Sequence, residues 1–378
     1  MCVFMRKRNA TLRSRMQDAI GFDRLEQGDP EAERRWRYFV GVSMEEFDRV
    51  YARLGVTFDH VLGESFYNDK MAPVVDELRA KGLLEESDGA QVVRLEDEGL
   101  PPCLILKSDG TTIYPTRDLA TAIYRRNVMR ADRMLYVVGA EQALHFNQVF
   151  TVLRRMGYEW ADACQHVPFG LMKMEGKKMS TRKGKVVFLD EVLDEAVQKA
   201  REAATSQISH RPVNAIDAAD AVGIGAVIFG DLRGSRMSEI DFSLDEMLRF
   251  EGDTGPYVQY THARTVSLLE KGQAAGYFPP YWDGQDPVVA VGPDGWACLK
   301  EVDGFPDSVR EAVRLNEPSV VTRKLLEIAK TFNRFYRSER ILTEDPAETM
   351  SKLLLTAAVG AVLHMGLGLL GIQAPKRM

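Results

Sequence analysis

The stretch RMLYVVGAEQ, residues 133–142, decides the fold of this chain. Its first seven residues make an almost continuous apolar run, as expected of a strand that is covered on both faces. A helical segment continues to Met156, and a second apolar run follows at residues 167–172. Because strand and helix alternate between Arg133 and Met172, we expect a parallel α/β sheet.

The segment after the second run, GKKMSTRKGK at residues 176–185, contains five cations and two glycines. It has no apolar periodicity, which predicts a loop between two buried strands. A flexible basic loop can bind phosphates and neutralise charge that develops in a transition state. A solvated Lys/Arg turn is the alternative, and charge content alone favours that alternative.

Length and composition bound the class of protein. The 378 residues can form two or three domains, and 45% hydrophobic with 28% charged residues is typical of a soluble globular protein. With a net charge of −6, an RNA partner would need local basic patches. The four cysteines form no Cys-x-x-Cys pair, so we expect reduced thiols in the cytoplasm and no metal site. The apolar stretch at residues 353–372 contains His364 and four glycines, which favours a buried helix over a membrane span.

Local signals predict the remaining elements. The capping box SMEE at residues 43–46 predicts a helix start, Gly55 predicts its end, and residues 56–59 read as a short strand. Asp109-Gly110 predicts the turn of a β-hairpin over residues 104–114, with positive φ at both central residues. Beyond Asp190 we expect no strand. Helices are predicted at residues 189–206, 216–232, 244–272, 297–311, 318–337 and 349–370.

The predicted fold class is therefore α/β followed by all-α, in three segments. Residues 1–75 are a helical insertion or remnant of the α/β domain, residues 76–205 are the second half of that domain with the basic loop, and residues 206–378 are a helical domain.

Tyr114, Asp118 and Gln142 form a first candidate site. Tyr114 and Asp118 are four residues apart at the start of a helix, and Gln142 follows the central strand at the end where α/β sheets bind ligands. A carboxylate that accepts a guanidinium in a bidentate fork would distinguish it from an ammonium. Each residue alone is better explained as a helix-start charge, a strand-end aromatic or a surface amide.

Gly139 lies at the turn from strand to helix, where free N–H groups can bind an anion or a ribose. His145 and His166 lie in segments that lead to the basic loop. The simplest explanation of each is a buried histidine whose hydrogen bonds are all made within the fold.

In the second half, EGDTGPYVQYTHAR at residues 251–264 interleaves aromatic, amide and cationic groups, which suits unstacked RNA bases. A helix whose Tyr/Val face is core is an equal alternative. Residues 332–337 repeat the composition on another helix. The candidate RNA-binding residues are Tyr257, Gln259, Tyr260, His262, Arg264, Asn333, Arg334 and Tyr336.

Four longer motifs occur in order: LKSDGTTIYPTRDLA from residue 106, YVVGAEQ from 136, KMSTRKG from 178 and EGDTGPYVQYTHAR from 251. This order resembles the arginyl-tRNA synthetases, a family of class I aminoacyl-tRNA synthetases, from about Trp36 to Met378. The resemblance implies part of a Rossmann-like catalytic domain followed by a helical anticodon-binding domain. It also implies arginine, ATP and tRNA(Arg) as substrates, Mg²⁺ carried with ATP, and no tightly bound cofactor.

The resemblance also implies roles for individual residues. The arginine side chain would be held by Tyr114, Asp118 and Gln142. ATP would be bound by Gly139, His145, His166, Lys178 and Ser180. The catalytic residues of the loop would be Lys178, Ser180, Arg182 and Lys183. Thr181 stands where the family has a second lysine, and neighbouring cations can supply that charge.

The family's first signature, His-x-Gly-His, is not formed by any of the six histidines: His60, His145, His166, His210, His262 and His364. We therefore expect this chain to be the C-terminal portion of a synthetase, to be inactive alone, and to be a monomer. A parallel sheet without its first strands would expose an edge and an apolar face, so we expect marginal stability and little aminoacylation alone. The alternatives are one half of a split enzyme with a complementary N-terminal half, or a non-catalytic tRNA-binding fragment.

Overall fold

The computed structural model describes residues 29–174, 177–178, 187–206, 218–277 and 291–378. The chain divides into two compact units, Met1–Thr57 and Phe58–Met378. Among the predicted site residues, Ser180, Arg182 and Lys183 and the side chain of Lys178 lie outside what the structure describes.

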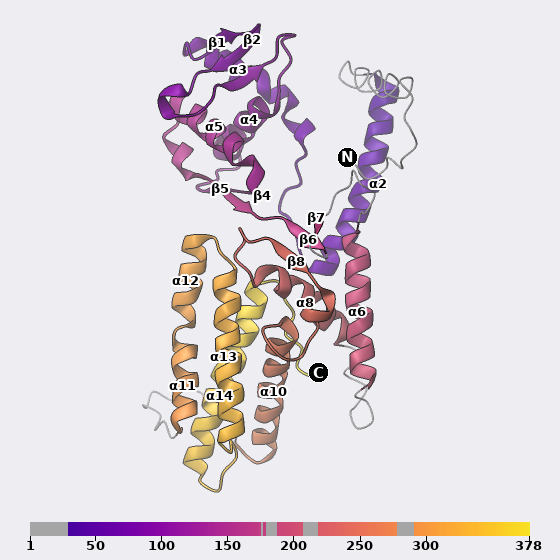
Figure 1. The fold of residues 1–378 in the computed structure, drawn as a ribbon, viewed down its shortest axis with the longest axis vertical. Helices are drawn as coiled ribbons and strands as arrows, with labels where there is room; N and C mark the ends of the chain where they lie inside the picture. The colour runs from indigo at the N-terminus through magenta and orange to yellow at the C-terminus, as the bar shows by residue number, and fades with distance from the viewer. Residues whose placement is uncertain (1–28, 175–176, 179–186, 207–217, 278–290) are drawn as a thin grey trace. The chain divides into compact units, whose positions relative to one another are not determined.

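The described part of the first unit is the helix α2, Pro30–Leu54 (Figure 1). Asp29 caps its start by accepting a hydrogen bond from the backbone N–H of Ala32 at 2.8 Å. Gly55 ends it in the left-handed conformation with φ 68°, as predicted. The predicted capping box at residues 43–46 is wrong, because the preceding residues already propagate the helix through it. Residues 56–59 form no strand.

The second unit begins with η1, Glu64–Lys70, and α3, Met71–Ala80, next to a small antiparallel sheet. Its strands are β1 (Glu85–Ser87), β2 (Ala90–Val93) and β3 (Cys103–Leu106), with the short helix η2 (Glu96–Glu98) between the last two. The predicted hairpin is confirmed at its turn, where Leu106 and Thr112 form an antiparallel bridge. Its first strand, β3, pairs along its length with β2 instead. Of the Asp109-Gly110 pair, only Gly110 has positive φ, at 80°.

The predicted parallel α/β region is confirmed. It comprises α4 (Tyr114–Asn127), β4 (Met134–Gly139), η3 (Ala140–Gln142), α5 (Ala143–Arg155), η4 (Glu159–Ala163) and β5 (Cys164–Phe169). Strands β4 and β5 are parallel, with Tyr136 opposite His166. One face of β4 is buried with α4 and α5 in a common core, whereas Leu135 and Val137 on the other face are 42% and 66% exposed. The expectation that this strand is covered on both faces is therefore wrong for β4, whereas the expectation of an exposed apolar face holds there.

A third sheet, of three strands, follows the parallel pair β4–β5. Its strands are β6 (Met172–Met174), β7 (Lys177–Lys178) and β8 (Ile240–Phe242), in the order β7-β6-β8. The prediction of no strand beyond Asp190 is wrong, because β8 pairs in parallel with β6. Three residues are too few to show an alternating pattern, so this pairing depends on the distant strand. The helix α6, Leu189–Ser206, crosses α8, Ala219–Leu232, where Gly223 allows close approach: a Cβ there would lie 2.7 Å from the backbone N of Val197.

The remainder is helical, as predicted. The helices are α9 (Leu244–Met247), α10 (Gly255–Ala274), α11 (Pro293–Asp303), α12 (Phe305–Leu315), α13 (Ser319–Ser338) and α14 (Pro346–Leu369). Helix α13 packs against α10, α11, α12 and α14 (Figure 1). The predicted helix 244–272 is in fact two, because Gly252 adopts φ 81° and Thr254 caps a new start. The predicted helix 297–311 also divides, at Gly304, before Pro306.

Helix α14 is long and apolar enough to cross a membrane by length and composition, and half of that window is buried. Its Leu353, Val359 and Leu363 belong to the core that α10 and α13 share. Such burial is typical of the core helix of a globular domain.

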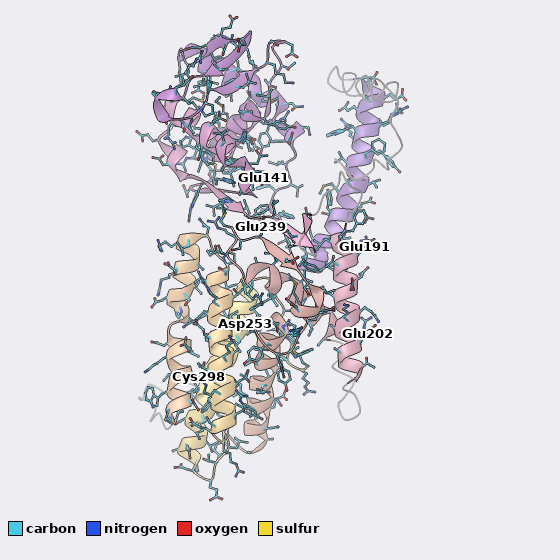
Figure 2. All side chains as sticks on the ribbon, viewed as in Figure 1. Glu141, Glu191, Glu202, Glu239, Asp253 and Cys298 are labelled. Carbon is cyan, nitrogen blue, oxygen red and sulfur yellow. The ribbon has the colours of Figure 1, made fainter. Side chains whose placement is uncertain are left out.

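The described cysteines are buried free thiols. Cys103 and Cys164 lie in the α/β core. Cys298, which is labelled in Figure 2, lies in the helical core. Burial raises the thiol pKa, to about 12 for Cys103 and to about 11 for Cys164 and Cys298. These thiols therefore stay protonated at neutral pH and contribute as small apolar side chains.

Candidate functional site

Asp118 and His145 form the centre of the first candidate site. Asp118 lies one turn into α4, and His145 lies in the first turn of α5. The Nε2 of His145 is 2.6 Å from the Oδ2 of Asp118, and their side chains are 20% and 32% exposed. The sequence interpretation placed His145 with ATP, whereas the structure brings it to the carboxylate predicted to bind the arginine side chain. The contact orients that carboxylate and leaves acceptor sites free on both of its oxygens.

Tyr114 and Gln142, the other two residues of this candidate site, lie at the starts of α4 and α5. Tyr114 is the first residue of α4 and is 67% exposed, and Gln142 ends η3 with its side chain exposed. Both are solvent-accessible, next to helix starts that leave backbone N–H groups without helical partners. The structure thus places Tyr114 and Asp118 on α4 and Gln142 on the turn after β4, and their joint binding of a guanidinium stays a prediction.

Arg117 and Glu64 were missed by the sequence interpretation. Nη1 of Arg117 lies 2.7 Å from Oε2 of Glu64, and its guanidinium carbon lies 5.9 Å from the centre of the Tyr114 ring. The helix η1 that carries Glu64 is held on α4 by the edge-to-face contact of Phe66 with Tyr124, with ring centroids 5.2 Å apart. The polar and aromatic residues 63–69 were a visible signal, but their partner is more than fifty residues away in the sequence.

The turn after β4 holds the predicted nucleotide residues. Gly139 precedes η3, and a Cβ there would lie 2.6 Å from a carboxylate oxygen of Glu141, which is labelled in Figure 2. The Glu141 carboxylate therefore folds back over the turn, and it is the flexible end of a side chain, which could move aside for a larger residue. His166 donates from Nε2 to the carbonyl oxygen of Val138 at 3.0 Å and stacks on Phe146 at 4.8 Å. These contacts satisfy His166 within the fold, and a role with ATP stays a prediction.

Of the basic loop, the structure describes only the short strand β7, Lys177–Lys178. Lys178 stands in β7 opposite Lys173 of β6, so the loop is entered from a short antiparallel pair. The predicted phosphate contacts of the loop stay predictions.

The second candidate site is a group on α10 and α13, which we call the Tyr–Arg cluster: Tyr257, Tyr260, Arg264, Asn333 and Tyr336. The guanidinium carbon of Arg264 lies 4.9 Å from the ring centre of Tyr260 and 4.8 Å from that of Tyr336. Arg264 also donates to Oδ1 of Asn333, whose amide nitrogen donates to the hydroxyl of Tyr257 at 3.0 Å. Tyr336 is 38% exposed, so the cluster reaches the surface. It combines aromatic rings with a fixed cation, and its contact with RNA stays a prediction.

Gln259, His262 and Asn333 are corrections to the predicted RNA-binding set. Gln259 is fully buried and donates to the carbonyl oxygens of Ala221 and Gln373 at 2.9 and 2.8 Å. His262 is 5% exposed and donates from Nδ1 to the carbonyl oxygen of Pro375 at 3.1 Å. Asn333 is 6% exposed. Because these side chains are buried inside the fold, they cannot stack on bases. Arg334 is exposed and is available for contact with RNA.

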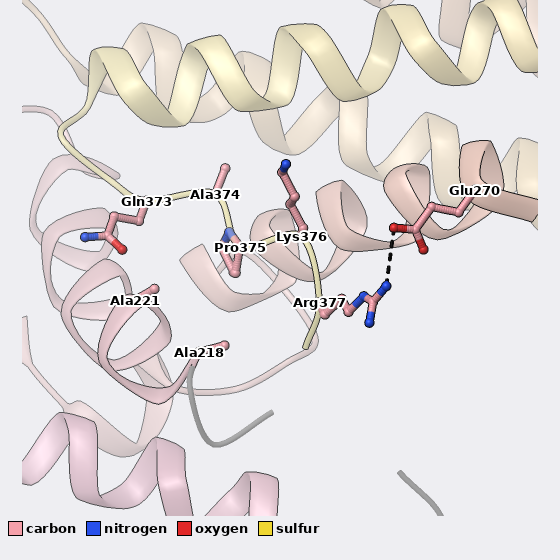
Figure 3. Close-up of a pocket in the computed structure, with 8 residues that line it drawn as sticks. All are labelled: Ala218, Ala221, Glu270, Gln373, Ala374, Pro375, Lys376 and Arg377. Atoms are coloured by element: carbon pink, nitrogen blue, oxygen red, sulfur yellow. Dashed lines mark ion pairs between the residues drawn. The ribbon is translucent and has the colours of Figure 1, made fainter. Parts of the chain in front are cut away.

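Gln259 and His262 bind the main chain of residues 371–378, which we call the C-terminal tail. This tail also borders a pocket of about 470 Å³. Figure 3 shows its lining of Ala218, Ala221, Glu270 and residues 373–377, with Arg377 and Glu270 3.6 Å apart. The pKa of His262 is lowered, mainly because burial removes the ring from water. The neighbouring His364 and Lys376 lower this pKa further. His262 is therefore neutral at physiological pH and serves as a packing and hydrogen-bonding group.

Comparison with known proteins extends these observations. Residues 12–244 match the family model of the class I tRNA synthetase catalytic domain of the arginine type, and residues 258–378 match the DALR anticodon-binding domain. The chain is 50% identical over 357 residues to an arginine–tRNA ligase of Exiguobacterium sp., covering 94% of this chain and 62% of the relative. An arginine–tRNA ligase of Lactobacillus acidophilus is also 50% identical, with the same coverage. The chain thus spans about 62% of the length of the curated relatives it matches.

Solved structures agree in fold. Thermus thermophilus arginyl-tRNA synthetase superposes with a TM-score of 0.79 at 26% identity, covering 94% of this chain and 68% of that structure. The Plasmodium falciparum arginyl-tRNA synthetase gives a TM-score of 0.83 at 22% identity, covering 97% and 62%. The predicted class I catalytic region followed by a helical anticodon-binding domain is therefore confirmed, while the domain boundaries at residues 75 and 205 stay predictions. The chain belongs to the arginyl-tRNA synthetase family.

Proposed function

We propose that this chain supplies the arginine side-chain site, the ATP-phosphate loop and the tRNA-binding domain of an arginine–tRNA ligase. The observation that carries the proposal is the Asp118–His145 contact, with the exposed Tyr114 on the same helix as Asp118 and the exposed Gln142 on the turn after β4. A carboxylate fixed by an imidazole can accept a guanidinium in a two-point fork. Tyr114 and Gln142 would complete the polar surround.

The basic loop would bind ATP phosphates with Mg²⁺ carried by the nucleotide. Lys178, Ser180, Arg182 and Lys183 supply cations and a hydroxyl at the spacing of the family's second signature. Charge on the phosphates rises as the carboxylate of arginine attacks, and positioned cations stabilise that charge. The reaction would occur in the cytoplasm.

Arginine binding tests the proposal directly. Calorimetry with the 378-residue protein should detect arginine and should detect lysine far more weakly, because an ammonium cannot make the two-point fork. Equal affinity for the two amino acids would contradict an Asp118 guanidinium site. Aminoacylation of tRNA(Arg), measured with the same protein, then shows whether these residues complete the reaction without the first histidine signature.

The Tyr–Arg cluster gives a prediction for RNA binding. Replacing Tyr336 with Ala should weaken binding of tRNA(Arg) about tenfold, because one stacking face and one side of the Arg264 sandwich are lost. Gel shifts at fixed salt measure the change. Tyr38→Ala is the matched control, since Tyr38 is 68% exposed on α2. Equal losses in the two variants would mean that the cluster is not the RNA-binding surface.

The bare face of β4 favours a second proposal, one half of a split enzyme. Leu135, Val137 and Phe169 are 42%, 66% and 44% exposed on the parallel pair β4–β5. A polypeptide that carries the region of the relatives which this chain does not span would cover these side chains and add strands to the sheet.

That proposal predicts the effect of a charge on the bare face. Val137→Glu should leave the thermal stability of the free protein nearly unchanged and abolish capture of the complementary polypeptide made from the Exiguobacterium relative. Val128→Glu is the matched control, because Val128 is 59% exposed at the end of α4. If the Val137→Glu protein still captures the complementary polypeptide, the exposed face of β4 is not the surface that binds it.

A further inference from the structure

We propose that Arg236 is a positioning residue that fixes residues 168–174, the segment leading into the basic loop, against the turn between α12 and α13. Its link to ATP rests on the phosphate role proposed above for the loop. Arg236 lies between α8 and β8, outside every motif that the sequence analysis used.

The side chain of Arg236 joins two carbonyl oxygens from distant segments. Its Nη1 donates to the carbonyl oxygen of Pro168, near the end of β5. Its Nε donates to the carbonyl oxygen of Asn316 at 3.1 Å. Asn316 ends α12 in the left-handed conformation with φ 50°, which sets the direction of its backbone. One planar guanidinium thus spans the end of the catalytic strand and the turn of the helical domain.

The backbone of Arg236 is held as firmly as its side chain. Its N–H donates to both carboxylate oxygens of Glu317, at 3.2 and 3.3 Å, and Glu317 also accepts from the hydroxyl of Ser235 at 3.2 Å. Its carbonyl oxygen accepts from the N–H of Gly170 at 2.7 Å. The backbone N and O, Nε and Nη1 of Arg236 are therefore all engaged at this junction.

These contacts continue into the strand that enters the loop. A Cβ at Gly170 would lie 2.6 Å from the carbonyl oxygen of Ser238, so the two backbones approach as closely as glycine allows. The N–H of Ile240 donates to the carbonyl of Leu171 at 3.2 Å, and β6 then pairs with β8 from Met172 onward. The next residue, Lys173, forms an ion pair with Glu239, which Figure 2 labels. Arg236 therefore stands at the head of the pairing that aligns β6.

A neighbouring contact provides a matched control. The side chains of Arg133, Gln165 and Asn316 form a polar group at the same α12–α13 turn, with 2.9 Å from Arg133 Nη2 to Gln165 Oε1 and 3.1 Å from Asn316 Nδ2 to Gln165 Oε1. Arg133 reaches the starts of β4 and β5 and makes no described contact with residues 168–174. Loss of Arg133 should weaken the junction without releasing β6.

Hydrogen exchange of the 378-residue protein tests the assignment. In Arg236→Lys, amides of residues 170–174 should exchange at least about tenfold faster, because an ammonium cannot hold both carbonyl oxygens in a planar fork. Exchange in α13 should be unchanged, which shows that the helical domain stays folded. Arg133→Lys should leave residues 170–174 unchanged. Unaltered exchange of residues 170–174 in Arg236→Lys, or equal acceleration in both variants, would overturn the proposal.

ATP binding provides the second readout. Arg236→Lys should weaken ATP binding at least about threefold while the affinity for tRNA(Arg) stays within error of the parent protein. Unchanged ATP affinity despite faster exchange would overturn the link between Arg236 and the nucleotide. If the parent protein binds no ATP, the proposed role of the loop fails, and hydrogen exchange still decides whether Arg236 positions β6.

Discussion

Asp118→Asn is expected to lower the affinity for arginine about 30-fold. The substitution keeps the shape of the side chain but removes the charge and one of the acceptors that a guanidinium fork requires. Losing one partner of a hydrogen-bonded charge pair costs about 2 kcal/mol or more, and we take the low end because Asp118 is 32% exposed. At 1.4 kcal/mol per tenfold, about 2 kcal/mol corresponds to the stated loss. Calorimetric titration with arginine measures it.

Two further variants separate charge from position. Asp132→Asn makes the same chemical change at a carboxylate that is 98% exposed and should leave arginine affinity unchanged. His145→Gln keeps a donor toward Asp118 and should cost less than Asp118→Asn, because the carboxylate remains. An Asp118→Asn protein that binds arginine as the parent does would place the amino-acid site elsewhere.

Lys352→Met is expected to destabilise the helical domain by about 3 kcal/mol, since it leaves the Glu339 carboxylate, which is only 14% exposed, without its cation. The Nζ of Lys352 lies 3.4 Å from Oε2 of Glu339 and 2.7 Å from Oε1 of Glu348, and Lys352 is 4% exposed. Glu339 in turn accepts from the N–H groups of Gly292 and Gly295, at 2.9 and 3.2 Å, at the start of α11. The ion pair thus also fixes a helix start.

Urea unfolding measures the loss, and Lys330→Met provides the control. Lys330 pairs with Asp253 at 2.5 Å, but both side chains are about half exposed, so the same substitution should cost at most about 1 kcal/mol. The double variant Glu339→Gln/Lys352→Met should recover part of the stability lost in Lys352→Met, because the uncompensated charge is gone. Equal costs for Lys352→Met and Lys330→Met would show that burial does not determine the strength of the pair.

Elements with long periodic patterns were predictable from the sequence. The apolar runs of β4 and β5 predicted their parallel pairing, and the helical character beyond residue 190 was recognised. Short or distant pairings were not predictable. β8 has three residues and depends on β6, and the Asp118–His145 contact joins residues 27 apart on two helices. Composition also does not distinguish the two faces of α10. Gln259 and His262 have the side chains of RNA-binding residues, but both are buried. Tyr260 and Arg264 of the same segment belong to the Tyr–Arg cluster.

The hydrogen bonds from Gln259 and His262 to the C-terminal tail determine which sequence changes that tail can tolerate. Both side chains donate to main-chain oxygens, at residues 373 and 375, and not to tail side chains. Substitutions at 373 and 375 therefore keep these acceptors in place. An insertion or deletion between residues 370 and 375 would shift the acceptors. Gln259 would then lose one of its two hydrogen bonds, and the buried Nδ1 of His262 would lose its partner, at about 1–3 kcal/mol. Selection on this tail should accordingly conserve its length more strictly than its residue types.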